Sequence, residues 1–166
     1  MTPRLATWIS VLTAVIVLAV GFAGWAAVRA GQWRTSNDAL ADATATAAAA
    51  DQISAGLKAI FSYNYGNLAR TERAAASVLV GDAVAQYRDT FAAAQQRATA
   101  QKLIRTTTVA SLGVQDLRDG SAQALAFLDQ QTLNTSTGQQ TSSSAAVSVT
   151  ARFVDGAWKI AVLTPL

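Results

Sequence analysis

The chain has 166 residues, a length that fits one compact domain with an appendage. It is 51% hydrophobic and carries a net charge of only +3, a composition that excludes a disordered chain. Charged residues make up 14% of the chain, well below their share in a typical soluble domain. Because the sequence contains no histidine and no cysteine, thiol nucleophiles, disulfides, imidazole bases and the common transition-metal sites are excluded as well.

The first predicted element is a membrane-spanning helix over residues 5–28, a stretch without any charged side chain. Such a helix is about 36 Å long, against a hydrocarbon core of roughly 30 Å. Trp8 and Trp25 lie near its two ends, where aromatic rings favour the membrane interface, and Arg29 follows directly. The stretch is longer than the apolar region of a cleaved signal peptide. We therefore expect an uncleaved single-pass anchor.

The charges that flank this span do not decide its orientation. Arg4 precedes the span, and Arg29 and Arg34 follow it, so the count of positive charges on the two sides is nearly even. The remaining segments are a short tail over residues 1–4, a juxtamembrane linker over 29–37 and one domain over 38–166.

Three helices are predicted after the linker. Thr35 and Asp38 resemble a capping box, and the alanine-rich chain from Asp38 to Tyr65 repeats apolar residues at three- and four-residue steps. A shorter helix is predicted over Ala69–Leu79, and Asp82 is predicted to cap a third. The long helix presents a narrow apolar stripe that can cover one face of a sheet.

Four strands are predicted in the second half of the domain. They lie over residues 104–114, 121–132, 145–154 and 157–163. Asp119-Gly120 and Asp155-Gly156 are signals of tight hairpin turns, and the polar run Asn134–Ser144 is interpreted as a solvated loop. Helices followed by hairpin-linked strands indicate an α+β domain, with three helices packed on a four-stranded, mostly antiparallel curved sheet.

Seven aromatic side chains are expected where the helices meet the sheet, lining either a packed core or a small apolar pocket. They are Phe61, Tyr63, Tyr87, Phe91, Phe127, Phe153 and Trp158. On the last strand, Trp158, Ile160 and Val162 are predicted to share one buried face, because side chains alternate along a strand.

No catalytic set, cofactor site or metal site is predicted. Glu72 is the only glutamate and lies among arginines, which favours a solvated helical turn. Asp129, two residues after Phe127, would suit a general base if it were buried, but no second acid or histidine is near it in sequence. The glycines lack phosphate-loop spacing, and the interspersed charges argue against nucleic-acid binding. We therefore expect a protein that is not an enzyme.

Five segments, in this order, resemble the actinobacterial Mce-associated membrane proteins. They are FSYNYGNL (Phe61–Leu68), VLVGDAVAQYRDTF (Val78–Phe91), TTVASLGV (Thr107–Val114), ALAFLDQQT (Ala124–Thr132) and VTARFVDGAWKIAVLTPL (Val149–Leu166). Those proteins are single-pass, and their outer domain resembles the nuclear-transport-factor-2-like (NTF2-like) fold and the VirB8 assembly subunit of type IV secretion systems. The order and spacing of the segments carry the resemblance across the chain. One departure is the sparse charge before the span, where many such proteins have a longer polar segment.

The resemblance implies a cytoplasmic N-terminus, an extracytoplasmic domain with a cystatin- or NTF2-like cone, and an accessory role in an Mce-type lipid-import complex of the cell envelope. The implied partners are membrane lipids and the protein subunits of that complex, and a second copy of the chain is a further candidate. Two alternatives remain open. One is a VirB8-like assembly subunit of a secretion system, and the other is an NTF2-like enzyme or binding protein for a small hydrophobic ligand.

Overall fold

The computed structural model describes residues 21–25 and 37–166, so the predicted anchor falls mostly outside the described residues. Residues 21–25 are helical, and Trp25 is exposed with its ring 5.8 Å from that of Phe22. Trp8 and Arg29 lie outside the described residues. In the part of the chain that is described, no helix is both long enough and apolar enough to cross a membrane. The anchor and its interface residues stay predictions.

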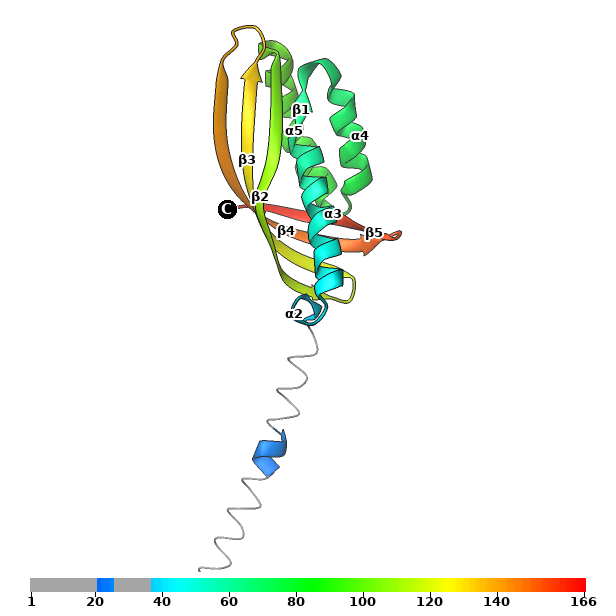
Figure 1. Cartoon of the computed structure of the whole chain (residues 1–166). Helices are drawn as coiled ribbons and strands as arrows, with labels where there is room; N and C mark the ends of the chain where they lie inside the picture. The colour runs from blue at the N-terminus through cyan, green and yellow to red at the C-terminus, as the bar shows by residue number, and fades with distance from the viewer. Residues whose placement is uncertain (1–20, 26–36) are drawn as a thin grey trace, which may run out of the picture. The chain divides into compact units, whose positions relative to one another are not determined.

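Residues 38–166 form one compact unit whose helices cover one face of a curved sheet (Figure 1). The helical elements of this unit are α2 (Asp38–Ala41), α3 (Ala43–Phe61), the 3₁₀ turn η1 (Tyr65–Asn67), α4 (Leu68–Val78) and α5 (Asp82–Gln101). The prediction of one long helix to Tyr65 is wrong at both ends. The helix is interrupted at Asp42, whose carboxylate accepts a hydrogen bond from the Ala45 nitrogen at 2.9 Å and caps α3.

Helix α3 ends at Phe61 because the next residues leave the helical conformation. Ser62 has extended dihedral angles (φ −98°, ψ 135°), and Tyr63–Asn64 form the short strand β1. The chain turns back into helix where the Asn67 side chain accepts a hydrogen bond from the Arg70 nitrogen at 3.2 Å, which caps α4.

The sheet has five strands instead of the four predicted, in the order β1-β2-β3-β4-β5, each antiparallel to its neighbour in sequence. Their bounds are β1 Tyr63–Asn64, β2 Leu103–Arg118, β3 Ser121–Asn134, β4 Gln140–Val154 and β5 Ala157–Pro165. The α+β class and the curved antiparallel sheet are confirmed. Both predicted turns are confirmed too, since Asp119, Gly120, Asp155 and Gly156 all have positive φ, as a tight hairpin turn requires.

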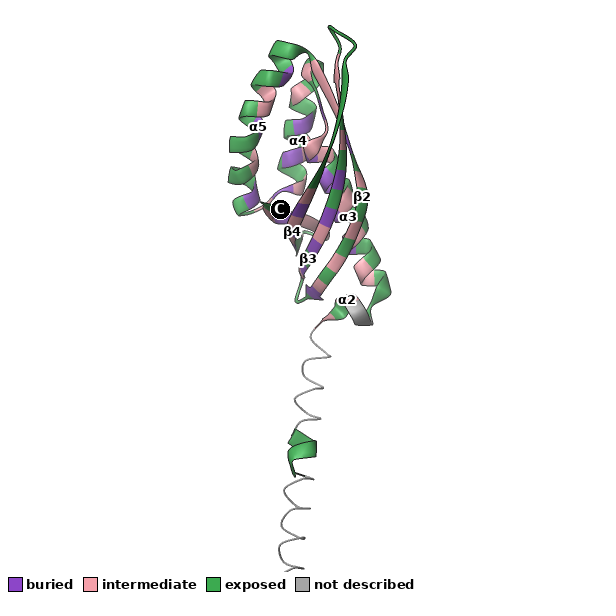
Figure 2. Ribbon diagram, turned by 90° about the vertical axis from the view of Figure 1, so that its left-hand side faces the viewer, coloured by how far each residue is buried: buried purple, intermediate pink, exposed green. Residues whose placement is uncertain are grey.

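The predicted loop over Asn134–Ser144 is mostly strand. Strand β4 begins at Gln140, and its polar residues pair with the end of β3, for example Ser144 with Asp129. Residues 140–145 are all exposed, in line with the green tip of this hairpin in Figure 2. A hairpin without a buried face shows no alternation of apolar and polar residues, so its sequence resembles that of a loop.

The core lies between α3 and the inner face of the sheet. The largest fully buried side chains are Ile53, Leu57, Ile60, Leu128, Val149 and Ile160. Along β3, every second residue from Ala122 to Leu128 is buried, which gives the striped strand in Figure 2. Helix α3 approaches β5 closely at Gly56, where a Cβ atom would lie 3.3 Å from Cδ1 of Ile160.

Strand β5 contains a register shift that its sequence pattern does not reveal. Ile160 and Ala161 are consecutive and both buried, and the pairing with β4 moves by one residue at this point. Beyond the shift, Leu163 packs against the core. The prediction that Trp158, Ile160 and Val162 share one face is therefore wrong at Val162.

Trp158 is only partly buried, so its replacement by alanine is expected to lower the free energy of unfolding by about 2 kcal/mol, less than for a fully buried tryptophan. The ring packs against the core and lies edge-on to Phe153, with centroids 5.5 Å apart. Thermal unfolding of the full chain in a non-ionic detergent measures the change. An unaltered melting temperature would contradict the packing of this ring.

Candidate functional site

Five of the seven predicted aromatic residues pack between the helices and the sheet. Phe61 and Trp158 lie against the main core, and Tyr63 and Phe91 are buried in a second cluster at the other end of the helices. Tyr87 contacts both clusters and stacks on Phe91, with ring centroids 4.9 Å apart. These rings are parts of packed clusters.

Phe127 and Phe153 do not line the core, and their prediction as core residues is wrong. Phe127 is 48% exposed on the outer face of β3, because its neighbours Ala126 and Leu128 both face inward. Phe153 is 51% exposed near the turn between β4 and β5. Apolar residues flank Phe127 on both sides in the sequence, so hydropathy alone could not show which face it occupies.

Neither candidate carboxylate lies in a buried acid–base arrangement. Asp129 is exposed on the outer face of β3 and accepts a hydrogen bond from the Ser144 hydroxyl at 2.8 Å. Glu72 is exposed on α4 and accepts a hydrogen bond from the Gln95 amide of α5. Among the described residues, no group of three or more carboxylates could hold a metal ion. Asp129 and Glu72 are therefore both exposed to solvent, and they lie on different elements, β3 and α4.

The packing of the helices raises the pKa of the Tyr87 phenol. Its hydroxyl donates to the Ile60 carbonyl oxygen at 3.2 Å. Burial of the ring, assisted by the negative charge of Glu72, raises the pKa of Tyr87 above its ordinary value of about 10. The neutral phenol is thus the form that the folded domain holds.

We expect Tyr87 to make the domain less stable in strong alkali. A raised folded-state pKa stabilises the fold below about pH 10, the unfolded value, and this contribution is lost as the pH rises toward the folded value. Unfolding free energy should therefore fall more steeply above pH 10 in the wild-type chain than in Tyr87→Phe. Lysine titration is common to both chains, so equal slopes would contradict this assignment.

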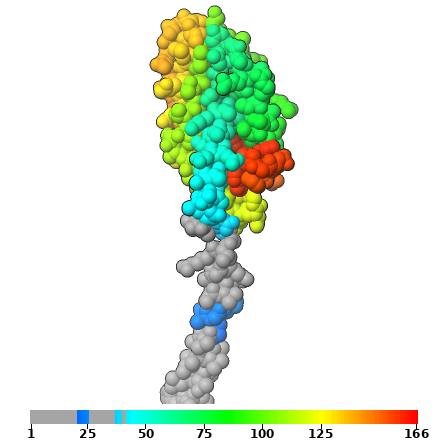
Figure 3. Space-filling model, turned by 45° about the vertical axis from the view of Figure 1, so that its right-hand side comes forward, coloured from blue at the N-terminus to red at the C-terminus, as the bar shows by residue number. Residues whose placement is uncertain are grey.

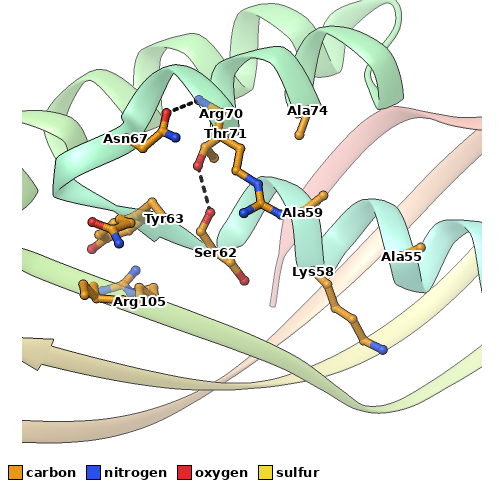
Figure 4. Close-up of a pocket in the computed structure, with 12 residues that line it drawn as sticks. Ala55, Lys58, Ala59, Ser62, Tyr63, Asn67, Arg70, Thr71, Ala74 and Arg105 are labelled. Carbon is orange, nitrogen blue, oxygen red and sulfur yellow. Dashed lines mark hydrogen bonds between the residues drawn. The ribbon is translucent and has the colours of Figure 1, made fainter.

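A pocket of about 670 Å³ lies where the end of α3 meets α4, β1 and β2 (Figure 4). Its lining includes three cations, Lys58, Arg70 and Arg105. Three alanines, Ala55, Ala59 and Ala74, form part of its wall.

Hydrogen bonds tie the walls of this pocket together. The Ser62 carbonyl oxygen accepts from the Thr71 hydroxyl at 3.1 Å, which joins the end of α3 to α4 (Figure 4). The Ser62 hydroxyl oxygen accepts from the Thr107 nitrogen at 3.0 Å, and the Thr107 hydroxyl donates to the Phe61 carbonyl at 2.9 Å. Both threonines are buried, so the pocket has a fixed frame.

Arg105 is held in place at the floor of the pocket. Its Nε atom donates to the Thr132 hydroxyl at 3.1 Å, and its guanidinium lies 5.2 Å from the centre of the Tyr63 ring. The sequence analysis missed this pocket because Lys58, Arg70 and Arg105 are far apart in the chain. The one available signal was an arginine at an inward-facing position of a strand.

No family model matches the chain. Over 157 residues it is 30% identical to the uncharacterized protein Rv1362c of Mycobacterium tuberculosis and to its counterpart in another strain, with 94% of this chain and 70% of that protein covered.

Among solved structures, the chain is similar to CagV, a VirB8 homolog of the Helicobacter pylori type IV secretion system, with a TM-score of 0.61 at 10% identity over 72% of this chain and 96% of that one. The periplasmic domain of DotI has a TM-score of 0.58 at 12% identity, over 70% of this chain and 91% of that one. The fold is therefore that of VirB8-like domains.

Proposed function

Since the chain belongs to the family of the uncharacterized mycobacterial protein Rv1362c, and its domain has the VirB8-like fold, we propose that it is a membrane-anchored assembly subunit of a multi-subunit envelope complex. It acts by contact, without catalysis. The observation that carries this proposal is the likeness of the fold to CagV, a protein of a type IV secretion system, over 72% of this chain and 96% of that one.

The geometry of the domain supports a contact role in two ways. The centre of the region between α3 and the sheet is occupied by packed side chains such as Leu57 and Leu128, where an NTF2-like enzyme would need room for its substrate. Two aromatic rings, Phe127 and Phe153, are instead about half exposed to solvent, and aromatic residues are enriched where proteins contact one another.

The anchor predicted over residues 5–28 supplies the second part of the proposal. With the amino terminus inside, as the resemblance to the Mce-associated proteins implies, this anchor would hold residues 38–166 at the outer surface of the cytoplasmic membrane. Partners in the same bilayer are then met at a high effective concentration, so that weak lateral contacts suffice for assembly.

The complex that this chain serves has two candidates. The likeness to CagV and to DotI favours a secretion-type machine. The five segments quoted above favour an Mce-type lipid importer, which the chain would stabilise as an accessory subunit.

Affinity purification of the tagged full chain from native membranes, after mild crosslinking, tests the proposal and separates the two candidates. We expect the chain to elute with several membrane subunits at fixed ratios, and their identity names the complex. Recovery of the chain by itself from crosslinked membranes would contradict an assembly role.

Asp129→Asn is expected to leave the protein level, the recovered complex and the transport phenotype unchanged, because this exposed carboxylate bonds only to Ser144 in the described structure. Growth and uptake assays on a complemented deletion strain measure this. A lost phenotype with an intact complex would instead assign Asp129 a chemical role.

A further inference from the structure

The pocket between α3, α4 and β2 has an unbalanced charge. Lys58, Arg70 and Arg105 line it from three different elements, and its lining includes no carboxylate. Lys58 and Arg70 are exposed on the helices, whereas Arg105 is partly buried on the strand. Like charges gathered around one cavity repel one another, and a bound anion offsets this repulsion because it attracts each of the cations.

The carboxylates of the described chain do not neutralise these cations. The ion pairs formed within residues 37–166 lie elsewhere and join Arg118 to Asp116 and Lys159 to Asp155. The nearby acid on α4, Glu72, accepts its hydrogen bond from Gln95 of α5. The three cations of the pocket are therefore free to meet a ligand.

The uncharged polar groups of the pocket add hydrogen-bond donors. The side-chain oxygen of Asn64 already accepts from the Gly66 nitrogen at 2.9 Å, and that of Asn67 from the Arg70 nitrogen, as Figure 4 shows. Each amide therefore has its NH₂ group left to donate. The Ser62 hydroxyl oxygen accepts a hydrogen bond from the Thr107 nitrogen of β2, so the hydroxyl hydrogen is left to donate as well.

We propose that this pocket binds a phosphate-type oxyanion, carried either by a soluble phosphate ester or by a phospholipid headgroup. A phosphate group offers several acceptor oxygens, and guanidinium groups bind such oxygens in pairs. The pocket volume of about 670 Å³ exceeds the size of one phosphate and is typical of small-molecule sites. The rest of the ligand lies along the alanine wall of Ala55, Ala59 and Ala74.

Arg105 is the principal anion-binding residue of this pocket, because its side chain is held in position before the ligand binds. The bond from Nε to Thr132 and the contact with the Tyr63 ring hold the guanidinium, while its two NH₂ groups keep their donors. Preorganisation of this kind reduces the entropy lost on binding. Lys58 and Arg70 lie on the exposed side of the pocket. This inference does not depend on the proposed assembly role.

Calorimetric titration of the full chain in a non-ionic detergent tests the site, with inorganic phosphate and glycerol phosphate as probes at constant ionic strength. We expect saturable binding, weakened at least tenfold by Arg70→Gln and by Arg105→Gln. Arg73→Gln makes the same change in charge on α4 outside the lining and should weaken binding less than twofold.

Arg70 is exposed, so its variant keeps the test valid if Arg105→Gln fails to fold. The proposal is overturned if phosphate binds neither in detergent nor in phosphatidylcholine nanodiscs. It is also overturned if chloride competes equally, or if Arg73→Gln weakens phosphate binding as much as Arg70→Gln.

A second arm of the experiment identifies the source of the phosphate. The same titration is repeated with the chain in lipid nanodiscs made of phosphatidylcholine, with and without phosphatidylglycerol. The site is assigned to the lipid headgroup if phosphatidylglycerol abolishes the soluble-phosphate signal of the wild-type chain and leaves the weaker signal of Arg105→Gln at its value in detergent. An unchanged signal supports a soluble ester.

Discussion

Leu128→Ala is expected to destabilise the domain by about 3 kcal/mol, because the lost methyl groups leave a cavity in a packed core. Leu128 is 1% exposed on β3, a central strand of the sheet, and belongs to the main core together with Leu57 and Val149. Urea or thermal unfolding of the full chain in detergent measures the change.

The neighbouring residue supplies the matched control. Phe127 is larger than Leu128 but lies half exposed on the opposite face of β3, so Phe127→Ala should cost only about 1 kcal/mol. A loss of stability for Phe127→Ala equal to or above that for Leu128→Ala would contradict the assignment of Leu128 to the buried face of β3 and of Phe127 to the exposed face.

Gly56→Leu is expected to destabilise the domain by about 3 kcal/mol through overpacking. Gly56 is buried, and a Cβ atom there would already lie 3.3 Å from Cδ1 of Ile160 and 3.7 Å from Cβ of Val78. A leucine side chain needs space that β5 and α4 both occupy.

Two further variants isolate this effect. Gly56→Ala should be nearly neutral, because a gain in helix propensity of about 1 kcal/mol offsets a small shift of the flexible Ile160 end. Ala48→Leu places the same side chain at an exposed position of α3 and should leave stability within about 0.5 kcal/mol. A chain that tolerates Gly56→Leu would contradict the close approach of α3 to β5.

Sequence patterns were most informative where one residue type performs one local task. The dipeptides Asp119-Gly120 and Asp155-Gly156 gave both hairpin turns, since few residues adopt positive φ easily. The position of α5 was predicted to within one residue, but the predicted cap was wrong, because Gly81 is the N-cap and Asp82 is already the first helical residue. The α+β class followed from the order of these elements.

Patterns failed where distant parts of the chain decide the outcome. β1 forms because Tyr63 and Asn64 pair with Arg105 and Ile104, forty residues away in the chain at the nearest. The register shift in β5 depends on the partner strand, and no local feature of Ile160 and Ala161 announces it. The three pocket cations could not be predicted for the same reason, because only the fold brings these residues of α3, α4 and β2 to one pocket.

The position of the last strand has a consequence for how the domain is made. Each strand pairs with the one before it, so the β2–β3 and β3–β4 hairpins can form before β5 is present. Ile160, however, bridges to Leu79, and β5 packs beside the lower half of α3 (Figure 3). Until β5 is in place, the part of α3 that faces Ile160 stays uncovered, and in that interval the chain is a substrate for chaperones and proteases.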